Sequence, residues 1–348
     1  MRRRKFLKQS GCAAMGILTL PAYQSAFAAN PYNDDVIIGH GDYRYKVDMN
    51  WGNLDPLLTP VKDCHEMVQD AKGRIVLLTN HTKNNVIIYD KSGKLLETWG
   101  TEYPGAHGLT LVNENGEDFL FITDYERHQV IKTTLKGKVV FTLDYPKETG
   151  KYDSAEAFKP TETTVIENGD FYVADGYGNQ YITQYNHRGE LLRIFGGKGT
   201  EDGQFLNAHG ICYDHRDPQQ PCLLISARAQ NKLKRFSLDG DYLSTIEVPG
   251  ALICRPVIHG KNSYFAVLKS ATASHPDSGF LLIMNDKNEV VSCPGATAPT
   301  YTNNRLDELY QTIRLFQYPH DVCVDEDENL YVAQWNSGNT YPIKLTRV

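Results

Sequence analysis

The feature that most constrains the fold of this chain is a unit that recurs six times along its 348 residues. Each copy has a short polar start, an apolar strand, an acidic or Gly/Asn turn, an aliphatic strand and two further strands. The copies begin near residues 64, 106, 160, 208, 254 and 319. Turns such as Lys91-Ser92-Gly93-Lys94 separate the strands with hairpin chemistry. Four antiparallel strands in each repeat of about 40–50 residues predict an all-β protein, a six-bladed β-propeller.

The two ends of the repeat array complement each other. The last copy is short and ends at Val348, so it lacks an outer strand. Segment 36–48, before the first copy, is expected to supply that strand and to remove the exposed edges between the first and last blades. A stacked solenoid is the competing architecture, but it needs capping ends, which the sequence does not display. We therefore expect one propeller domain over residues 29–348.

Residues 302–316, TNNRLDELYQTIRLF, depart from the strand pattern. Apolar residues follow a candidate cap at Asn304 with the spacing of one helix face, namely Leu306, Leu309, Tyr310 and Ile313. The pattern predicts one short helix inserted before the last blade. Such a helix would pack on one propeller face, either as structural cover or as a lid.

The first 28 residues read as a twin-arginine export signal. The motif RRKFLK, starting at Arg3, precedes a mildly apolar stretch, and Ala26-Phe27-Ala28 has the small-x-small pattern that signal peptidase cuts. A lipoprotein signal centred on Cys12 is the weaker alternative, because Gln9 stands where an aliphatic residue is usual. We expect recognition by the Tat translocase and a periplasmic or secreted product that begins near Ala29.

Composition excludes several partner classes. The net charge is −6 and no basic cluster follows the signal, which argues against a nucleic acid partner. No later apolar run is long enough to cross a bilayer, so an integral membrane protein is not expected.

The cysteines lack the CxxC spacing of thiolate zinc sites. In an oxidising compartment Cys212 could pair with Cys222 and Cys254 with Cys293, but the connectivity stays open.

The first residues of the six copies occupy equivalent positions. In a propeller, residues that start the innermost strands lie beside the central axis, so we expect a ring of His65, His107, Thr161, His209, Arg255 and His320. Copies two, four and six each contribute a histidine, and alternate blades are related by a rotation of about 120°. Three imidazoles with an open fourth position are typical of a catalytic zinc site. The alternative is that each histidine is a hydrogen-bonded structural residue near a strand end.

With these residues in place, the chain resembles the lyase domain of peptidylglycine α-amidating enzymes, a six-bladed propeller of the NHL-repeat group. The resemblance covers most of the chain after the signal. It is strongest in PTETTVIENGDFYVADGYGNQYITQYNHRGELLRIFG, GQFLNAHGICYD and YPHDVCVDEDENLYVA. It implies a catalytic Zn²⁺ bound by His107, His209 and His320.

The same resemblance implies roles for further residues. Tyr177, within DGYGN, corresponds to the catalytic tyrosine, and Arg228, within SARAQN, corresponds to a substrate-binding arginine. A structural Ca²⁺ is implied at Asp321 and at the backbone carbonyls of Met67 and Leu109. The family's reaction breaks a carbon–nitrogen bond of a peptidyl α-hydroxyglycine and releases an amide and glyoxylate. Tyr177 would act as the base beside the zinc ion.

The chain also departs from the family pattern. Lys83 stands in the loop where the family has a second substrate-binding arginine, and the cysteine after the catalytic tyrosine is replaced by Gly178. His65 and Arg255 add axial groups that the family lacks. His65 is either a fourth metal ligand or a second acid or base, and Arg255 is, with Arg228, a candidate partner for an anionic group of the substrate.

The sequence therefore predicts an exported, metal-dependent propeller lyase that acts on a small-molecule or peptide-terminal substrate. Two alternatives remain open. Propeller scaffolds host unrelated chemistries, so a hydrolase or lactonase acting on sugars or lactones fits the same fold. A non-catalytic NHL-repeat binding protein, in which the ring is a structural plug, is the second alternative.

Overall fold

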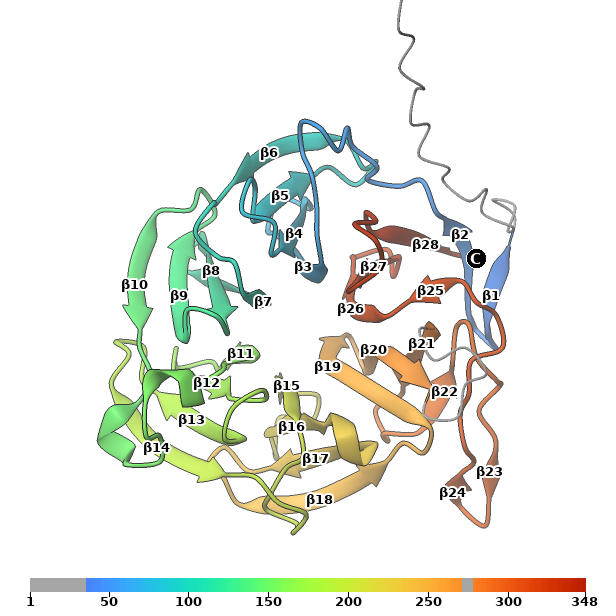
Figure 1. Ribbon diagram of the computed structural model, residues 1–348. Coiled ribbons are helices and arrows are strands. Elements are labelled where there is room, and N and C mark those ends of the chain that lie inside the picture. Colours follow the sequence, from blue (N-terminus) through green and yellow to red (C-terminus); the bar gives the residue numbers. More distant parts are fainter. Residues whose placement is uncertain (1–35, 271–277) are drawn as a thin grey trace, which may run out of the picture. The chain divides into compact units, whose positions relative to one another are not determined.

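The computed structural model describes residues 36–270 and 278–348. Nearly all its regular structure is β-strand, and the helices of this part of the chain are three 3-10 turns, Lys147–Thr149, Ala155–Ala157 and Arg228–Gln230. The strands form six antiparallel sheets arranged around one axis, with a small extra hairpin (Figure 1). The predicted six-bladed β-propeller is confirmed. The export signal predicted for residues 1–28 lies outside the described residues.

Blades 1 to 5 follow the chain in order, each from its innermost strand outward. Blade 1 contains β3 (Cys64–Gln69), β4 (Ile75–Thr79), β5 (Val86–Tyr89) and β6 (Leu95–Trp99). Blade 2 contains β7 (Ala106–Glu114), β8 (Glu117–Asp124), β9 (Gln129–Thr134) and β10 (Val139–Leu143). Blade 3 contains β11 (Glu162–Val165), β12 (Phe171–Ala174), β13 (Tyr181–Tyr185) and β14 (Leu191–Gly196). Blade 4 contains β15 (Ala208–Asp214), β16 (Cys222–Ala227), β17 (Lys232–Phe236) and β18 (Tyr242–Glu247). Blade 5 contains β19 (Ala251–His259), β20 (Asn262–Ser270), β21 (Ser278–Met284) and β22 (Val290–Ser292).

Blade 6 is built from both ends of the described chain. Its inner strands are β26 (Pro319–Val324), β27 (Leu330–Gln334) and β28 (Ile343–Arg347), and its outer strands are β2 (Tyr43–Asp48) and β1 (Ile37–His40). β2 pairs antiparallel with β28, so the blue and red strands lie side by side in Figure 1. This pairing joins the start of the array to its end and leaves the ring of blades without a break.

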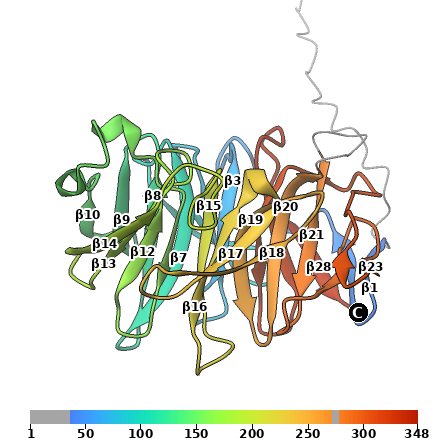
Figure 2. The same cartoon turned by 90° about the horizontal axis from the view of Figure 1, so that it is seen from below.

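Apolar residues pack between neighbouring blades. In β4, Ile75 and Leu77 join a buried cluster with Tyr331 of blade 6, whereas Val76 and Leu78 join a cluster with blade 2. Successive residues of a strand point to opposite faces, and a strand buried on both faces is therefore apolar throughout. The side view shows the strands standing along the propeller axis (Figure 2). This packing holds the innermost strands in a rigid ring around the axis.

The prediction of a short helix within residues 302–316 is wrong. The segment instead contains a hairpin of β23 (Tyr301–Thr302) and β24 (Arg305–Leu306), followed by β25 (Phe316–Gln317), which pairs with β21. Asn303 and Asn304 connect β23 to β24 with φ angles of 51° and 62°. Two residues of positive φ make the tight turn that suits the twist of a hairpin, and asparagine tolerates them well. The helical spacing of apolar residues was therefore outweighed by turn chemistry.

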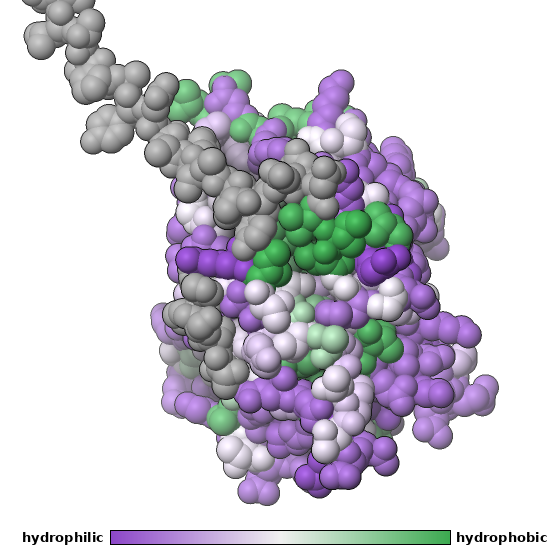
Figure 3. Space-filling model, turned by 90° about the vertical axis from the view of Figure 1, so that its right-hand side faces the viewer, coloured by the Kyte–Doolittle hydropathy of each residue, from purple (hydrophilic) through white to green (hydrophobic). Residues whose placement is uncertain are grey.

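All six cysteines of the described residues are free thiols, so the pairs considered from the sequence, Cys212 with Cys222 and Cys254 with Cys293, do not form. No helix in these residues is long and apolar enough to span a membrane. The side on the right of Figure 1 is mostly hydrophilic, and its most extensive hydrophobic area is compact, with smaller apolar spots elsewhere on this face (Figure 3).

Candidate metal centre

Five of the six innermost strands break their pairing register where they pass the axis. The breaks fall between Cys64 and Glu66, Ala106 and Leu109, Ala208 and Ile211, Ile253 and Pro256, and Pro319 and Asp321. A regular strand sends neighbouring side chains to opposite faces, but a bulge locally ends this alternation. As a result, two consecutive residues of a strand can both reach the axis.

These residues form two layers along the axis. The first, which we call the histidine layer, contains His65, His107, Thr161, His209, Cys254 and His320. The second, which we call the carboxylate layer, contains Glu66, Glu162, Arg255 and Asp321. The expected position of Arg255 beside the histidines is therefore wrong, because Cys254 takes the blade 5 place in the histidine layer. Aligning Ile253-Cys254-Arg255 with Pro319-His320-Asp321 would have revealed this from the sequence.

The four histidines of this layer lie close together. The ring centroid of His107 is 4.8 Å from that of His320 and 4.9 Å from that of His209, and the His209 and His320 centroids are also 4.9 Å apart. His65 adds a fourth ring, 4.8 Å from His107 and 4.9 Å from His320. None is more than 2% exposed. The structure thus brings together the three histidines predicted from alternate blades and places His65 among them.

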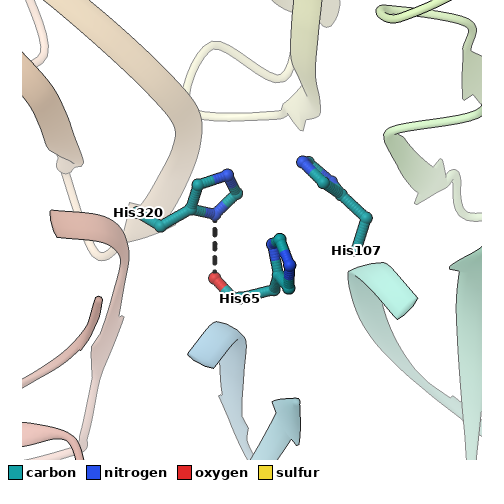
Figure 4. A group of neighbouring side chains, drawn as sticks. All are labelled: His65, His107 and His320. Carbon is teal, nitrogen blue, oxygen red and sulfur yellow. Dashed lines mark hydrogen bonds between the residues drawn. The ribbon is translucent and has the colours of Figure 1, made fainter. Parts of the chain in front are cut away.

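Hydrogen bonds to backbone carbonyls orient two of these rings. Nδ1 of His107 donates to the carbonyl of Thr161 at 2.8 Å, and Nδ1 of His320 donates to the carbonyl of His65 at 3.0 Å, the bond drawn in Figure 4. A carbonyl can only accept, so the proton of each ring is on Nδ1 and the lone pair is on Nε2. Metal-binding histidines commonly have such a partner. The unpaired Nε2 of His320 is therefore prepared to bind a cation.

Several buried nitrogens of the layer have no partner among the described residues. They are both ring nitrogens of His65, Nδ1 of His209 and Nε2 of His320. A buried polar atom without a partner is unfavourable, and its presence calls for an explanation such as a missing ion. Burial lowers the pKa of all four histidines, which keeps them neutral and able to bind metal. This donor set fits a metal ion.

Two overlapping groups of residues could each hold a metal ion. Within each group, the potential ligand atoms all lie within 4.8 Å of one another. One consists of His65, His107 and His320, whose rings converge in Figure 4. The other consists of His209, Cys254 and His320. Imidazole nitrogen and thiolate sulfur are both common zinc ligands. His320 belongs to both groups, and Cys254 is a candidate ligand that the sequence reasoning missed.

The side chain of Tyr177 reaches the histidine layer from a loop of blade 3. Its hydroxyl lies 3.0 Å from Nε2 of His107 and 3.2 Å from Nε2 of His209. Asp175 holds this loop, because its carboxylate accepts the backbone N–H groups of Lys159 at 2.7 Å and Asn179 at 2.6 Å. Tyr177 is 37% exposed, so one part of the ring faces solvent while the hydroxyl points inward. The residue connects the buried layer to the outside.

Arg228 brings a positive charge to the same place. It begins the 3-10 turn after β16, and Nη2 lies 3.3 Å from the Tyr177 hydroxyl. Its Nε donates to Oδ1 of Asn207 at 2.7 Å, which fixes the direction of the guanidinium. Burial raises the pKa of Tyr177, and the charge of Arg228 opposes that shift. A phenol, a guanidinium and candidate metal-binding histidines thus lie within contact of one another.

The remaining predicted residues have other surroundings. Thr161 is fully buried, and its hydroxyl lies 3.2 Å from the carbonyl of Ala174 and 3.3 Å from that of Ala208. Lys83 is exposed and donates from Nζ to the carbonyl of Leu57 at 2.7 Å. The groups expected to hold Ca²⁺, Asp321 and the carbonyls of Met67 and Leu109, all accept hydrogen bonds from Arg255. A calcium ion does not fit among them while the guanidinium is there.

Comparison with known proteins gives relatives in sequence and in structure. The sequence matches no family model. It is 31% identical to peptidyl-alpha-hydroxyglycine alpha-amidating lyase 1 of Drosophila melanogaster over 276 residues, which is 70% of this chain and 46% of that protein. It is 23% identical to peptidylglycine alpha-amidating monooxygenase of Rattus norvegicus over 95% of this chain and 31% of that protein. The chain therefore spans less than half the length of either relative.

The propeller also resembles solved structures. A gluconolactonase of Xanthomonas campestris superposes with a TM-score of 0.55 at 13% identity, covering 88% of this chain and 90% of that one. At this level of identity the likeness concerns the fold alone.

Proposed function

We propose that this chain, a relative of the peptidyl-alpha-hydroxyglycine alpha-amidating lyases, is itself a metal-dependent lyase that cleaves the carbon–nitrogen bond of an α-hydroxylated substrate. The substrate class is a peptide or small amide that ends in α-hydroxyglycine. One observation supports this most: the hydroxyl of Tyr177 lies within 3.2 Å of ring nitrogens of two histidines, and Arg228 lies beside it.

The reaction needs one proton to be removed and one to be returned. Loss of the proton from the α-hydroxyl lets its carbon become a carbonyl while the carbon–nitrogen bond breaks. The amide nitrogen then receives a proton, and the products are the shortened amide and glyoxylate. No oxidant or reductant is consumed. A base that reaches both a buried site and solvent suits this exchange.

Tyr177 is the candidate base, and Arg228 is the candidate anchor. In its ionised form Tyr177 would accept the hydroxyl proton. Burial raises the pKa of Tyr177, and the nearby guanidinium opposes this shift through its charge. Arg228 would also bind the substrate carboxylate, because its planar fork matches two carboxylate oxygens. Asn207 directs this fork, so it serves as a positioning residue.

The histidine layer is the candidate site of the metal, which we propose to be Zn²⁺. His107, His209 and His320 would hold it, with His65 and Cys254 as the further candidates. A bound zinc ion polarises a substrate oxygen and stabilises the negative charge that develops there. The neutral rings and their unpaired nitrogens support this assignment.

The test uses the full chain as purified. Metal content is measured first, and about one equivalent of zinc or a similar divalent metal is expected. The protein is then incubated with a peptidyl α-hydroxyglycine, and glyoxylate is assayed against a Tyr177→Phe control. Glyoxylate release that needs both the metal and Tyr177 supports the lyase. Hydrolysis of a lactone in place of glyoxylate release would favour the hydrolase, and metal-free protein with neither activity would favour a binding protein.

We also propose that the chain is exported to the periplasm or secreted, since residues 1–28 carry the twin-arginine pattern. Replacing Arg3 and Arg4 together by lysine should retain the product inside the cell. Export that is unaffected by this change would contradict the proposal.

A further inference from the structure

Directly beside the histidine layer, the carboxylate layer buries three acidic side chains and one guanidinium around the axis. Glu66, Glu162 and Asp321 are each 1% exposed, and Arg255 is 9% exposed. They come from blades 1, 3, 6 and 5, so the layer joins segments that are distant in the sequence. Burying a charge is costly unless it is paired and hydrogen-bonded. This layer must therefore be held by specific contacts.

Arg255 uses every N–H group of its guanidinium. Nε and Nη2 bind the two carboxylate oxygens of Asp321 at 2.7 and 2.9 Å. Nη2 also donates to the carbonyl of Met67, and Nη1 to that of Leu109, both at 2.9 Å. Nη1 lies 3.1 Å from Oε2 of Glu66 as well. An arginine has five such donors, so this set of oxygens matches the fork completely.

The oxygen atoms around Arg255 are also of the kind that binds a hard cation. Three carboxylates and two backbone carbonyls surround the guanidinium. Calcium prefers this chemistry, with six to eight oxygen ligands. Two of the acids are fixed by the neighbouring blade: Asp321 accepts the N–H of Met67 at 2.8 Å, and Glu66 accepts that of Leu109 at 2.6 Å. The oxygens are thus arranged for a positive charge, whatever its source.

We infer that Arg255 is a built-in cation that takes the place of a bound calcium ion, so that this propeller needs no calcium. Its guanidinium joins blade 5 to blade 6 and to the carbonyls of blades 1 and 2. Removing it would leave a cluster of acidic oxygens able to take Ca²⁺. This inference goes beyond the proposed lyase activity and does not depend on it.

A path for the ion is also visible. A cavity of ≈ 990 Å³ is lined by Arg255 and by residues that follow the carboxylate layer along the inner strands, among them Met67, Thr110 and Thr163. The cavity opens to solvent on the side of Arg255 that faces away from the histidine layer. Calcium added to a variant without the guanidinium could therefore reach the layer without unfolding the protein.

The experiment measures the melting temperature (Tm) of the full chain as purified while CaCl₂ is added, with MgCl₂ as the control ion. Calcium is raised to about 5 mM, above the range of weak extracellular calcium sites. For the unchanged protein we expect no shift in Tm and no calcium bound in isothermal titration. Arg255→Ser should lower Tm by about 5–10 °C, because it leaves buried carboxylates unpaired. Calcium, but not magnesium, should restore much of that loss.

Arg255→Lys is the matched control. It keeps a positive charge but loses the fork, so we expect a lower Tm that calcium does not raise. Saturable stabilisation of the unchanged protein by calcium, lost in Asp321→Asn, would overturn the inference. So would an Arg255→Ser protein that folds and binds no calcium. If Arg255→Ser fails to fold during expression, the calcium titration of the unchanged protein tests the inference. The refolding yield of Arg255→Ser with and without calcium then gives a second measurement.

Discussion

The hydroxyl oxygen of Tyr177 lies 3.0 Å from Nε2 of His107, at the point where a loop of blade 3 reaches the axis. Nδ1 of this histidine donates its proton to the carbonyl of Thr161, so its Nε2 accepts from Tyr177. A metal ion bound to this nitrogen would replace the phenolic proton as its partner. The contact between the Tyr177 hydroxyl and Nε2 of His107 thus places the candidate base next to the candidate metal site.

Tyr177→Phe should abolish most glyoxylate release and leave metal content unchanged. Removing a general base typically costs about 10²–10⁴-fold in rate. The measurement is the rate under saturating substrate, together with metal analysis of the same sample. Tyr125→Phe is the matched control, because this ring packs against Tyr177 at a centroid distance of 5.7 Å. Equal losses of activity in the two variants would show that the hydroxyl of Tyr177 does not act as the base.

His320→Ala should weaken metal binding more than either His65→Ala or Cys254→Ser. His320 belongs to both groups of convergent ligand atoms, whereas each of the other two belongs to one. We expect its affinity loss to exceed the 10–100-fold that removal of an outer-shell partner typically costs. Competition with a coloured chelator measures the affinities. If His65→Ala changes nothing while Cys254→Ser weakens binding, the metal lies on the blade 5 side of the layer.

Asn207→Gly should raise KM for a substrate with a free carboxylate about tenfold, because Arg228 loses the acceptor that directs it. Glycine is chosen because Asn207 has a φ of 63°, which glycine adopts without strain. Asn231→Gly, with a φ of 54°, is the control, since Asn231 ends the same 3-10 turn and bonds the carbonyl of Ala251. Steady-state kinetics of both variants separate positioning from stability. A similar KM in both would contradict the role of Asn207.

Gly178→Ala should displace the loop that carries Tyr177. A Cβ atom there would lie 2.1 Å from Oδ1 of Asp175 and 2.3 Å from the carbonyl of Ala157. Misplacing a catalytic group by about 1 Å can cost on the order of 10²-fold in rate. Activity should therefore fall while metal content stays the same. Gly203→Ala is the control, because nothing lies within 4 Å of its added Cβ. Full activity in Gly178→Ala would show that the loop adapts.

Part of the candidate site followed from the repeat pattern. Each copy places its first residues at the same point of a blade, so histidines at the start of copies two, four and six had to share one level of the axis. Cys254 was missed because Arg255, one residue later, was taken as the position of copy five that is equivalent to the histidines. It also suggested a helix where Asn303 and Asn304 make a hairpin turn. Local turn chemistry decided that segment against apolar spacing.

The sequence by itself determined the number of blades, since turn residues and alternating apolar runs are local properties of each copy. Only the tertiary structure decided which side chains meet at the axis. Bulges in the inner strands let consecutive residues such as His320 and Asp321 both reach the axis, in separate layers. Whether a guanidinium or an ion occupies the carboxylate layer depends on contacts between blades 1, 2, 5 and 6. Such contacts join residues that are far apart in the sequence, as Met67 and Asp321, 254 positions apart, show.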